Sequence, residues 1–369
     1  MVLKKDENLI EDLLIFDAHC DTANVLFDKH FSFIDERQIH LGVEKIKKGG
    51  LKSQIFAIWV NPVYSSFRSI NKALSLYQVL KEEIFSKGYG TKVTSTIEMQ
   101  SCLKKNKLAC WISLEGGHII EDSPEILDLF YYLGIRSMTL THTKTTGWAD
   151  SSNDKPKWDG LNELGKKIVK RMDKLGIAID ISHASDKCVE DVLDTSSMPI
   201  MASHSCARAL CDIPRNLPDD LIKKIADRGG YIGVAFYPGF LKKRIYNQLI
   251  NNYKKFNKEY QDKIEENKDN PDIINQAQFE LYKKMVKGID QVDLHSVIDH
   301  IIHVAEIGGI DCVGLGSDFD GILSTPTDLK DVSCYPALVN GLSEKGFKIT
   351  EIKKIMGLNL FNYLKNFDP

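Results

Sequence analysis

Residues 13–21 read LLIFDAHCD, an apolar run that ends in His19 and Asp21. Side chains two residues apart in a β-strand point to the same face, so we expect His19 and Asp21 to face one way and Cys20 the other. Neutral imidazole and carboxylate are ligands that suit zinc and similar divalent ions. A strand that carries such residues only at its C-terminal edge is typical of a parallel barrel with its reaction centre at one rim.

Five further apolar runs end in the same kinds of residue. They are LACWISLEGG (108–117) with Glu115, IRSMTLTH (135–142) with His142, IAIDISH (177–183) with His183, PIMASH (199–204) with His204, and VGLGSDFDG (313–321) with Asp318 and Asp320. Because parallel barrels build their sites from the ends of several strands, we expect these side chains to converge. One histidine at a strand end usually just makes a hydrogen bond, so the prediction of a metal site rests on the whole set. Asp318 and Asp320 have the same parity, and their spacing leaves open which one faces the rim.

Strand-like runs alternate with helical patterns along the chain. We expect strands at 13–19, 53–60, 109–115, 135–141, 176–182, 198–203, 230–236 and 311–317. Between the fourth and fifth predicted strands lies the segment GLNELGKKIVKRMDKLG (160–176). Its apolar residues have helical spacing, and it ends in glycine. Apolar strands alternating with amphipathic helices indicate parallel βα units, and eight of them make a TIM barrel. The predicted fold class is α/β, a single (β/α)8 TIM barrel in one domain over residues 1–369.

A bare barrel takes about 250 residues, so a chain of 369 has room for an insertion. The clearest candidate lies at about 239–292, between the seventh and eighth predicted strands. It is rich in Lys, Asn, Glu and Gln, with Tyr253, Phe256 and Tyr260 at helical spacing. We interpret it as inserted helices that cover the barrel mouth or form an oligomer contact, as in a homodimer. The alternative is a solvated helical excursion with no role in the site.

The amino-acid composition limits the kinds of binding partner and the cellular compartment that we expect for this protein. The chain has 48 basic and 51 acidic residues and a net charge of −3, so nothing predicts binding to nucleic acid or to an anionic membrane. No run approaches the roughly 18 apolar residues that span a bilayer, and we expect neither a signal peptide nor a lipid anchor. The eight cysteines form no C-x-x-C pair, which is typical of buried thiols in a reducing compartment. We therefore expect a cytoplasmic protein.

The sequence gives less reason to place the remaining histidines in the metal site. His300 and His303 lie in a helical pattern, where a packing or surface role is favoured, and His118 could support the site from behind Glu115. The chain also lacks the G-x-S-x-G nucleophile elbow and the phosphate-binding G-x-x-x-x-G-K loop. The metal-type strand ends are therefore the main functional signal.

Several motifs in a fixed order resemble one known family. They are FDAHCDT (16–22), SLEGGHII (113–120), LGIRSMTLTHTKTTGWADS (133–151), GIAIDISHAS (176–185), ASHSCAR (202–208), RNLPDD (215–220) and GLGSDFDG (314–321). Over nearly the whole chain, the sequence resembles the membrane dipeptidase family, also called renal dipeptidases, which are zinc peptidases of the amidohydrolase-type barrels. The resemblance implies hydrolysis of dipeptides.

The resemblance also implies a centre of two divalent ions, with zinc as the expected metal. Its five implied ligands are His19, Asp21, Glu115, His183 and His204. In this scheme His19 and Asp21 bind one ion, His183 and His204 bind the other, and Glu115 bridges both. Such a pair of ions shares a water and lowers its pKa, so that a bridging hydroxide attacks the peptide carbonyl.

Three further residues match the family's substrate-contacting positions. His142 corresponds to the histidine that contacts the substrate carbonyl, where a donor stabilises developing charge. Arg215 corresponds to the arginine that contacts the substrate carboxylate, which its planar fork can pair bidentately. Asp318 corresponds to the aspartate near the bridging water, and a carboxylate there can carry a proton to the leaving amine.

Two other functions stay open at this point. An N-acyl amino acid hydrolase, or another amidohydrolase, lactonase or phosphoesterase, could use the same two-metal site on a different bond. A barrel that keeps its metals as structure and serves as a binding protein is the third hypothesis. Asp318 and His142 argue against it, because structure alone needs neither a proton shuttle nor an oxyanion donor.

Overall fold

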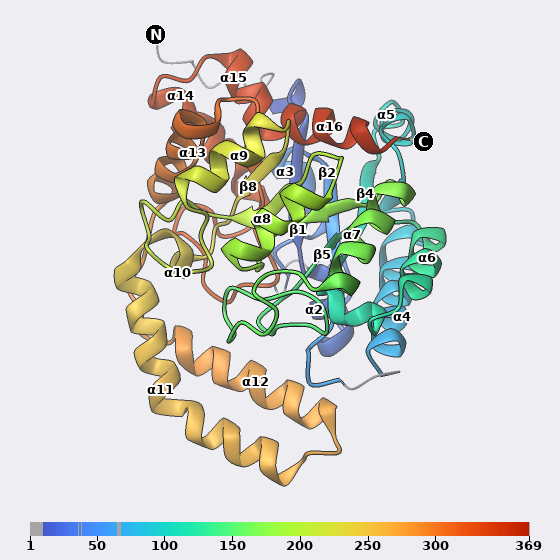
Figure 1. Cartoon of the computed structure of the whole chain (residues 1–369). Coiled ribbons are helices and arrows are strands. Elements are labelled where there is room, and N and C mark those ends of the chain that lie inside the picture. Colours follow the sequence, from blue (N-terminus) through green and yellow to red (C-terminus); the bar gives the residue numbers. More distant parts are fainter. Residues whose placement is uncertain (1–9, 36, 38, 65–67, 369) are drawn as a thin grey trace.

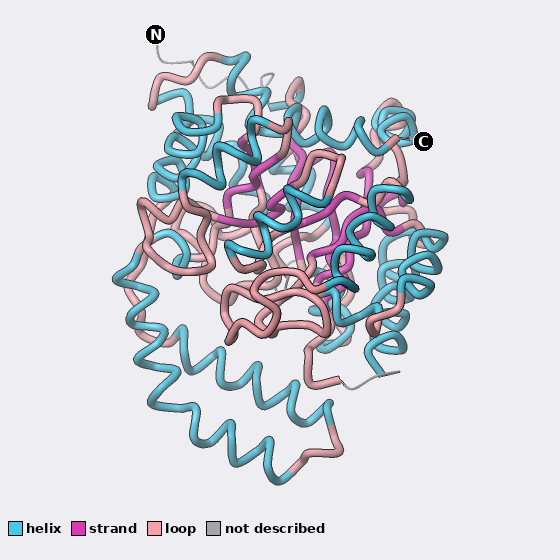
Figure 2. Tube along the Cα trace, in the orientation of Figure 1, coloured by secondary structure: helices cyan, strands magenta, loops and turns pink. Residues whose placement is uncertain are grey.

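The computed structural model describes residues 10–35, 37, 39–64 and 68–368. Eight parallel strands close into a ring, which confirms the predicted barrel (Figures 1 and 2). They are β1 (Ile15–Cys20), β2 (Leu51–Trp59), β4 (Leu108–Glu115), β5 (Ile135–Thr139), β6 (Ala178–Asp180), β7 (Met201–Ser205), β8 (Tyr231–Val234) and β9 (Val313–Leu315). The ring runs β2, β1, β9, β8, β7, β6, β5, β4, and pairing of β2 with β4 closes it.

A ninth strand, β3 (Gly90–Lys92), was not among the predicted ones. It pairs only with residues 108–110 at the start of β4, while β5 pairs with residues 112–115 of the same strand. Because β2 pairs with β4 along residues 109–115, β3 extends the sheet without entering the ring.

Helices surround the barrel on its outer side (Figure 2). They are α2 (Thr22–Lys29), α3 (Val43–Gly49), α4 (Arg68–Leu80), α5 (Thr96–Leu103), α6 (Pro124–Leu133), α7 (Glu163–Leu175), α8 (Asp186–Thr195), α9 (Asp219–Asp227), α13 (Leu294–Gly308), α14 (Tyr335–Glu344), α15 (Ile349–Lys353) and α16 (Asn359–Leu364). Short helical turns lie at η1 (Lys81–Phe85), η2 (Gly117–Ile120), η3 (Val332–Cys334), η4 (Lys354–Leu358) and η5 (Lys365–Phe367).

The helix predicted within 160–176 shows how local sequence sets these boundaries. It forms α7, and the Asn162 side chain at its start accepts hydrogen bonds from the N–H groups of Leu164 and Gly165. This cap satisfies donors that the first turn leaves unpaired. Gly176 ends the helix with φ +71°, a left-handed conformation that glycine adopts without steric cost.

The predicted insertion is helical. It comprises α10 (Pro238–Leu241), α11 (Lys243–Glu266) and α12 (Pro271–Val286), between the seventh and eighth strands of the ring. Figure 1 shows α11 and α12 as an antiparallel pair beyond one end of the barrel, with α16 at the opposite end. Figure 1 shows the long green loop that follows β5 on the same side of the barrel as α11 and α12.

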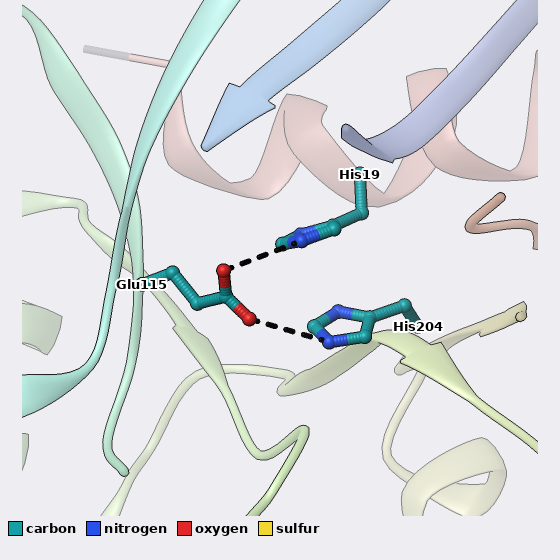
Figure 3. A group of neighbouring side chains, drawn as sticks. All are labelled: His19, Glu115 and His204. Atoms are coloured by element: carbon teal, nitrogen blue, oxygen red, sulfur yellow. Dashed lines mark ion pairs between the residues drawn. The ribbon is translucent and has the colours of Figure 1, made fainter. Parts of the chain in front are cut away.

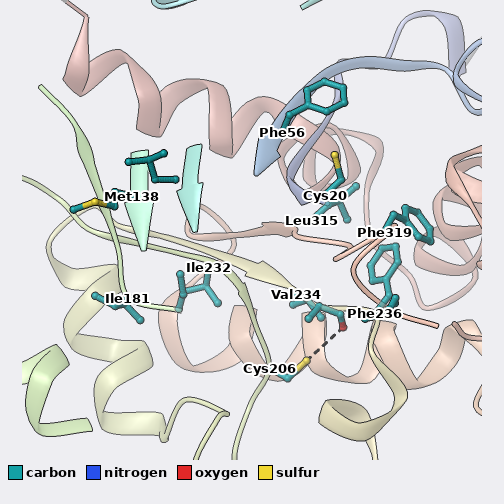
Figure 4. Packing of buried hydrophobic residues seen from close by; sticks show 14 of the residues in the cluster. Cys20, Phe56, Met138, Ile181, Cys206, Ile232, Val234, Phe236, Leu315 and Phe319 are labelled. Carbon is teal, nitrogen blue, oxygen red and sulfur yellow. Dashed lines mark hydrogen bonds between the residues drawn. The ribbon is translucent and has the colours of Figure 1, made fainter. Parts of the chain in front are cut away.

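The core has an inner and an outer part. Inside the barrel, Phe16, Trp111 and Tyr231 from the strands pack in one cluster with Leu360 and Tyr363 of α16. The barrel is therefore filled near the end that α16 covers, as expected for a fold whose site lies at the other rim. The outer cluster joins the strands to the helices, and Figure 4 shows part of it.

The structure bears on the predictions about the cysteines and about membrane-spanning segments. The eight cysteines are free, and all but Cys334 are buried, in agreement with their interpretation as buried thiols. In the part of the chain that the structure describes, no helix combines the length and the apolar character that crossing a membrane requires.

Candidate metal centre

Glu115 lies at the centre of the group of predicted ligands. It ends β4, and its two carboxylate oxygens point toward different histidines (Figure 3). Oε2 lies 3.5 Å from His19 Nε2. Oε1 lies 3.3 Å from His183 Nε2 and 3.5 Å from His204 Nε2. The ends of β1, β4 and β7 and the segment after β6 thus meet around one carboxylate.

His19 reaches Glu115 because β1 is irregular. In a regular strand Ala18 and Cys20 would face the same way, yet Ala18 packs in the inner cluster and Cys20 in the outer one. Pairing with β2 shifts register within residues 17–20, so β1 holds one extra residue there. Such a bulge re-aims side chains, and it turns His19 inward. His19 Nε2 also lies 3.4 Å from Asp21 Oδ2, while Cys20 faces away as predicted.

His204 lies in a similar irregularity of β7. Pairing with β8 shifts register within residues 202–205. Its Nδ1 lies 2.8 Å from Ser203 Oγ, and its Nε2 lies 2.9 Å from His183 Nε2. Gly316, which directly follows β9, makes this arrangement possible, since a Cβ at that position would lie 1.8 Å from Ser203 O.

Two of the predicted site residues have unusual backbone conformations. His183 has φ +69° and Asp318 has φ +64°, in the left-handed region that non-glycine residues rarely occupy. Such conformations concentrate at functional sites. Asp318 forms a compact group with His19 and Asp21. A Cβ at Gly321 would lie 2.2 Å from Asp21 Oδ2 and 2.5 Å from Asp318 Oδ1, so both carboxylates border the space that this glycine leaves free.

Asp320 has a different environment, which distinguishes it from Asp318. Its carboxylate accepts hydrogen bonds from Thr22 Oγ1 at 2.6 Å and from the His40 N–H at 2.5 Å. Its own N–H donates to His40 Nδ1 at 2.8 Å. Asp320 therefore ties the strand end to the loop around His40, and Asp318 is the aspartate that lies beside the ligands.

His142 joins the same cluster from the segment after β5. Its Nε2 lies 3.7 Å from Glu115 Oε1, and its ring centroid lies 4.2 Å from that of His183 and 5.3 Å from that of Trp59. The Ser151 hydroxyl donates to the His142 carbonyl at 2.6 Å and holds the loop in place. The His142 side chain is 16% exposed, against 8% for His183, so a solute can reach it more easily.

Arg215 lies behind His204, in the loop between β7 and α9. Its Nη1 donates to Ser205 Oγ at 2.8 Å and its Nη2 donates to the His204 carbonyl at 2.6 Å. The guanidinium carbon lies 5.0 Å from the ring centroid of Phe240. Arg215 is buried, and its Nε has no hydrogen-bond partner among the described residues. A guanidinium has five N–H donors, so donors remain for a further acceptor.

Burial and close charges shift the pKa values of the cluster. Burial raises the pKa of Glu115 to about 7, and the Asp21 charge adds to this rise. Burial would lower the pKa of His19, but the Glu115 and Asp21 carboxylates outweigh it and hold that pKa well above its usual value. Burial keeps the pKa of His183 well below its usual value, and the positive charge of Arg215 lowers that pKa further.

Burial likewise lowers the pKa of His142 and of His204 well below the usual value. Neutral imidazole is the form that binds metals. Burial raises the pKa of Asp318 well above its usual value, and the Asp21 and Glu115 carboxylates act in the same direction.

The donor set fits divalent metal ions. Three groups of side chains bring their ligand atoms within 4.8 Å of one another: His19–Glu115–His204, Glu115–His142–His183 and His19–Asp21–Asp318. His19 Nε2 is buried and lacks a hydrogen-bond partner among the described residues, although two carboxylates lie 3.4 and 3.5 Å away. Several carboxylates buried together need positive charge to offset their desolvation. Imidazoles and carboxylates in this number fit zinc and similar ions.

Two residues that frame the centre were not among the predicted site residues. Asp17 Oδ1 accepts from Ser317 N at 2.9 Å, and Tyr335 donates its hydroxyl to Asp17 Oδ2 at 2.6 Å. Asp180 Oδ1 accepts from Ser203 N at 2.9 Å. Both aspartates are buried. Their signal in the sequence is a charged residue within an apolar strand, which needs internal hydrogen bonds to be buried.

His118 supports the site only indirectly. Its Nε2 lies 2.8 Å from the Val60 carbonyl, just beyond the end of β2. Burial lowers the pKa of His118 to about 4, so the ring is neutral and donates this hydrogen bond. It thereby holds the β2 end against the segment after β4.

The comparisons with known proteins agree over the whole chain. The family described as "Membrane dipeptidase (Peptidase family M19)" matches residues 3–368. Dipeptidase 3 of Macaca fascicularis is 27% identical over 368 residues, covering 97% of this chain and 66% of that protein. Human dipeptidase 3 is also 27% identical, over 98% of this chain and 66% of that protein. This chain thus spans a little less than two thirds of the length of these relatives.

Solved structures share the fold. The probable dipeptidase PvdM from Pseudomonas aeruginosa superposes with a TM-score of 0.84 at 26% identity, covering 98% of this chain and 97% of that one. A metallopeptidase from Rhodobacter sphaeroides, solved with a phosphinate mimic of the dipeptide L-Ala-D-Ala, has a TM-score of 0.75 at 22% identity over 96% of this chain and 99% of that one. At that lower identity the likeness shows the barrel fold alone.

Proposed function

The chain belongs to the membrane dipeptidase family, and from this premise we propose that it is a zinc-dependent dipeptidase. One observation carries the proposal. Residues from the ends of β1, β4 and β7 and from the segment after β6 converge on Glu115, although the sequence separates them widely. This cluster is buried, rich in imidazole and carboxylate, and lies at the rim where barrels of this class carry out chemistry.

The cluster offers ligands for two ions. His19 and Asp21 would hold one, His183 and His204 the other, and Glu115 would contact both through its separate oxygens. When bound, such ions lower the pKa of a water that they share and polarise a carbonyl oxygen.

The protein's own groups would then orient the substrate and move protons. Arg215 would pair with the substrate's free carboxylate through the donors that its contacts with Ser205 and His204 leave available. His142, the most exposed imidazole of the cluster, would donate to the carbonyl oxygen as charge develops. Asp318 would carry a proton to the leaving amine nitrogen, and its burial-raised pKa suits a carboxyl that must hold a proton near neutral pH.

An N-acyl amino acid hydrolase remains the second candidate, because Arg215 would serve any substrate with a free carboxylate next to the scissile amide. A substrate panel separates the two. Dipeptides, N-acyl amino acids and phosphoesters should be assayed with zinc-loaded protein and with the chelated protein as control. Preference for dipeptides supports the proposal, while preference for N-acyl amino acids or phosphoesters, or no turnover of any substrate, contradicts it.

A further inference from the structure

The inserted helix α12 is fastened to the barrel rim next to β2. Asn61, two residues beyond the end of β2, donates from Nδ2 to Asn275 Oδ1 and to Gln278 Oε1, both at 2.9 Å. The Tyr64 hydroxyl donates to Asp272 Oδ1 at 2.5 Å. Asn61 is only 3% exposed, so α12 covers this part of the rim.

This fastening point lies close to His142. The Trp59 ring at the end of β2 is 5.3 Å from the His142 ring, and the Trp59 carbonyl accepts a hydrogen bond from Asn24 Nδ2 at 2.9 Å. The segment from Trp59 to Asn61 therefore connects α12 to the side of the centre where His142 lies.

The middle of α12 lies against the end of α2, which follows β1. Asn275 Nδ2 donates to Asp28 Oδ2 at 3.4 Å. Lys29 Nζ lies 3.8 Å from the centroid of the Phe279 ring, a cation–π contact. The helix thus follows the rim from β2 past β1.

The far end of α12 reaches the side of the centre where Arg215 lies. The Tyr282 ring is 6.2 Å from the Tyr237 ring, and the Tyr237 ring is 4.8 Å from that of Phe240. Phe240 in turn packs under the Arg215 guanidinium. Tyr237 and Tyr282 are partly exposed, so they can form a wall that a solute touches. Burial raises the pKa of both tyrosines, and the negative charge of Asp318 adds a smaller rise.

We infer that α12 is a roof over the substrate pocket that limits the substrate to two residues, with Tyr282 as its specificity-determining residue. This inference rests on the proposed dipeptidase function. The contacts of this helix run from the His142 side to the Arg215 side, so the roof crosses the space above any substrate that these residues hold. Figure 1 shows α12 beyond this end of the barrel. If Arg215 fixes the C-terminal carboxylate, an additional residue at the N-terminus must leave the pocket past this helix.

The test compares a dipeptide with the tripeptide that extends it by one N-terminal residue. The variants are Tyr282→Ala, which opens the wall, and Asn61→Ala, which removes the fastening at β2. We expect each to raise the ratio of tripeptide to dipeptide kcat/KM about tenfold or more, the scale of a changed contact in a specificity pocket. Tyr282→Phe keeps the ring and should leave the ratio unchanged. Glu280→Gln is the matched control, because Glu280 is an exposed residue of the same helix whose partner is Lys283 at 2.9 Å.

Amide hydrogen exchange gives a second measurement that does not depend on turnover. Asn61→Ala should speed exchange within α12, while Glu280→Gln should not. The inference would be wrong if Tyr282→Ala and Asn61→Ala both left the ratio of tripeptide to dipeptide kcat/KM unchanged, whether or not hydrogen exchange in α12 became faster. It would also be wrong if Glu280→Gln raised that ratio as much as the alanine variants do. Failure of the proposed dipeptidase function can be told apart from these outcomes, because the unaltered protein would then hydrolyse neither the dipeptide nor the tripeptide. In that case the inference about α12 would be wrong as well.

Discussion

Asp17 and Asp180 hold equivalent positions on two sides of the candidate metal centre. Each is a buried strand residue whose Oδ1 accepts the backbone N–H two residues further along its own chain segment. Each also accepts the N–H of a serine that precedes a predicted site residue. For Asp17 this is Ser317, before Asp318 in the segment after β9, and for Asp180 it is Ser203, before His204 in β7. Every such pair of bonds therefore fixes two strand ends relative to each other.

The Asp180 contacts predict selective loss of one metal. Asp180→Ala leaves two buried N–H groups unpaired beside His183 and His204, and loss of such supporting bonds typically lowers metal affinity about 10- to 100-fold. One of two binding events in a calorimetric zinc titration of metal-free protein should show this loss, while the other stays close to wild type. Asp180→Asn keeps an oxygen acceptor and should lose less. Equal loss at both sites in both variants would contradict a local role.

Metal content provides the most direct check on the centre. Protein purified without chelator should contain two divalent ions per chain by elemental analysis, and removing them should abolish turnover until zinc is restored. Bound metal should also stabilise the fold, by about 2.7 kcal/mol at a free concentration 100 times the Kd. A stoichiometry near zero or one with full activity would rule out the two-ion centre.

Arg215 should discriminate between a free carboxylate and an amide. Replacing it with methionine removes a charge-assisted hydrogen bond worth about 1.5–3 kcal/mol, or about 10- to 150-fold in kcat/KM, for the dipeptide. The C-terminal amide of the same dipeptide should lose far less. Because Arg215 also donates to Ser205 and His204, a thermal melt is needed beside the kinetics. Equal losses on both substrates would assign Arg215 a purely structural role.

The two aspartates after β9 should behave differently. Asp318→Asn should retain both metals and lower kcat by about 10² or more, because an amide cannot carry the proton. Asp320→Asn should instead lower the melting temperature, since its carboxylate accepts hydrogen bonds from Thr22 and His40. Kinetics, metal content and melting of both variants check this. An active Asp318→Asn beside an inactive, stable Asp320→Asn would reverse the assignment.

Acid should destabilise the protein partly through His300. Its Nδ1 accepts the Ala207 N–H at 3.0 Å, its Nε2 lies 3.1 Å from the Leu241 carbonyl, and burial lowers its pKa to about 4. The unfolded chain, with an ordinary histidine pKa near 6.5, takes up the proton first. The stabilisation is therefore complete above about pH 6.5 and is lost as the pH falls toward 4. His300→Gln, which can make both hydrogen bonds without titrating, should show a shallower loss of unfolding free energy between pH 7 and 4.5 in urea titrations.

The sequence predicted the barrel and the convergence of its strand ends, because the C-terminal ends of parallel strands necessarily share a rim. His19, Glu115, His183 and His204 are close for that reason. The functional roles given to these residues remain predictions, as does zinc itself.

Other features depend on contacts between strands that no single segment encodes. The bulges that aim His19 and His204 arise from register against β2 and β8. Asp318, and not Asp320, lies beside the predicted ligands because Asp320 is hydrogen-bonded to His40, which lies 280 residues away in the sequence. The short strand β3 has little hydrophobic pattern and binds only the start of β4.

The place of β9 between β1 and β8 has a consequence for synthesis of the chain. The first strand of the ring lacks one neighbour until residues 313–315 have emerged from the ribosome, and Asp318 emerges with them. Pairings this distant in sequence form slowly, because the long intervening loop must be closed first. Once His204 has emerged, a nascent chain therefore carries all five predicted metal ligands on an open sheet until residues 313–315 follow. We expect ion capture by the complete site to belong to the last stage of maturation.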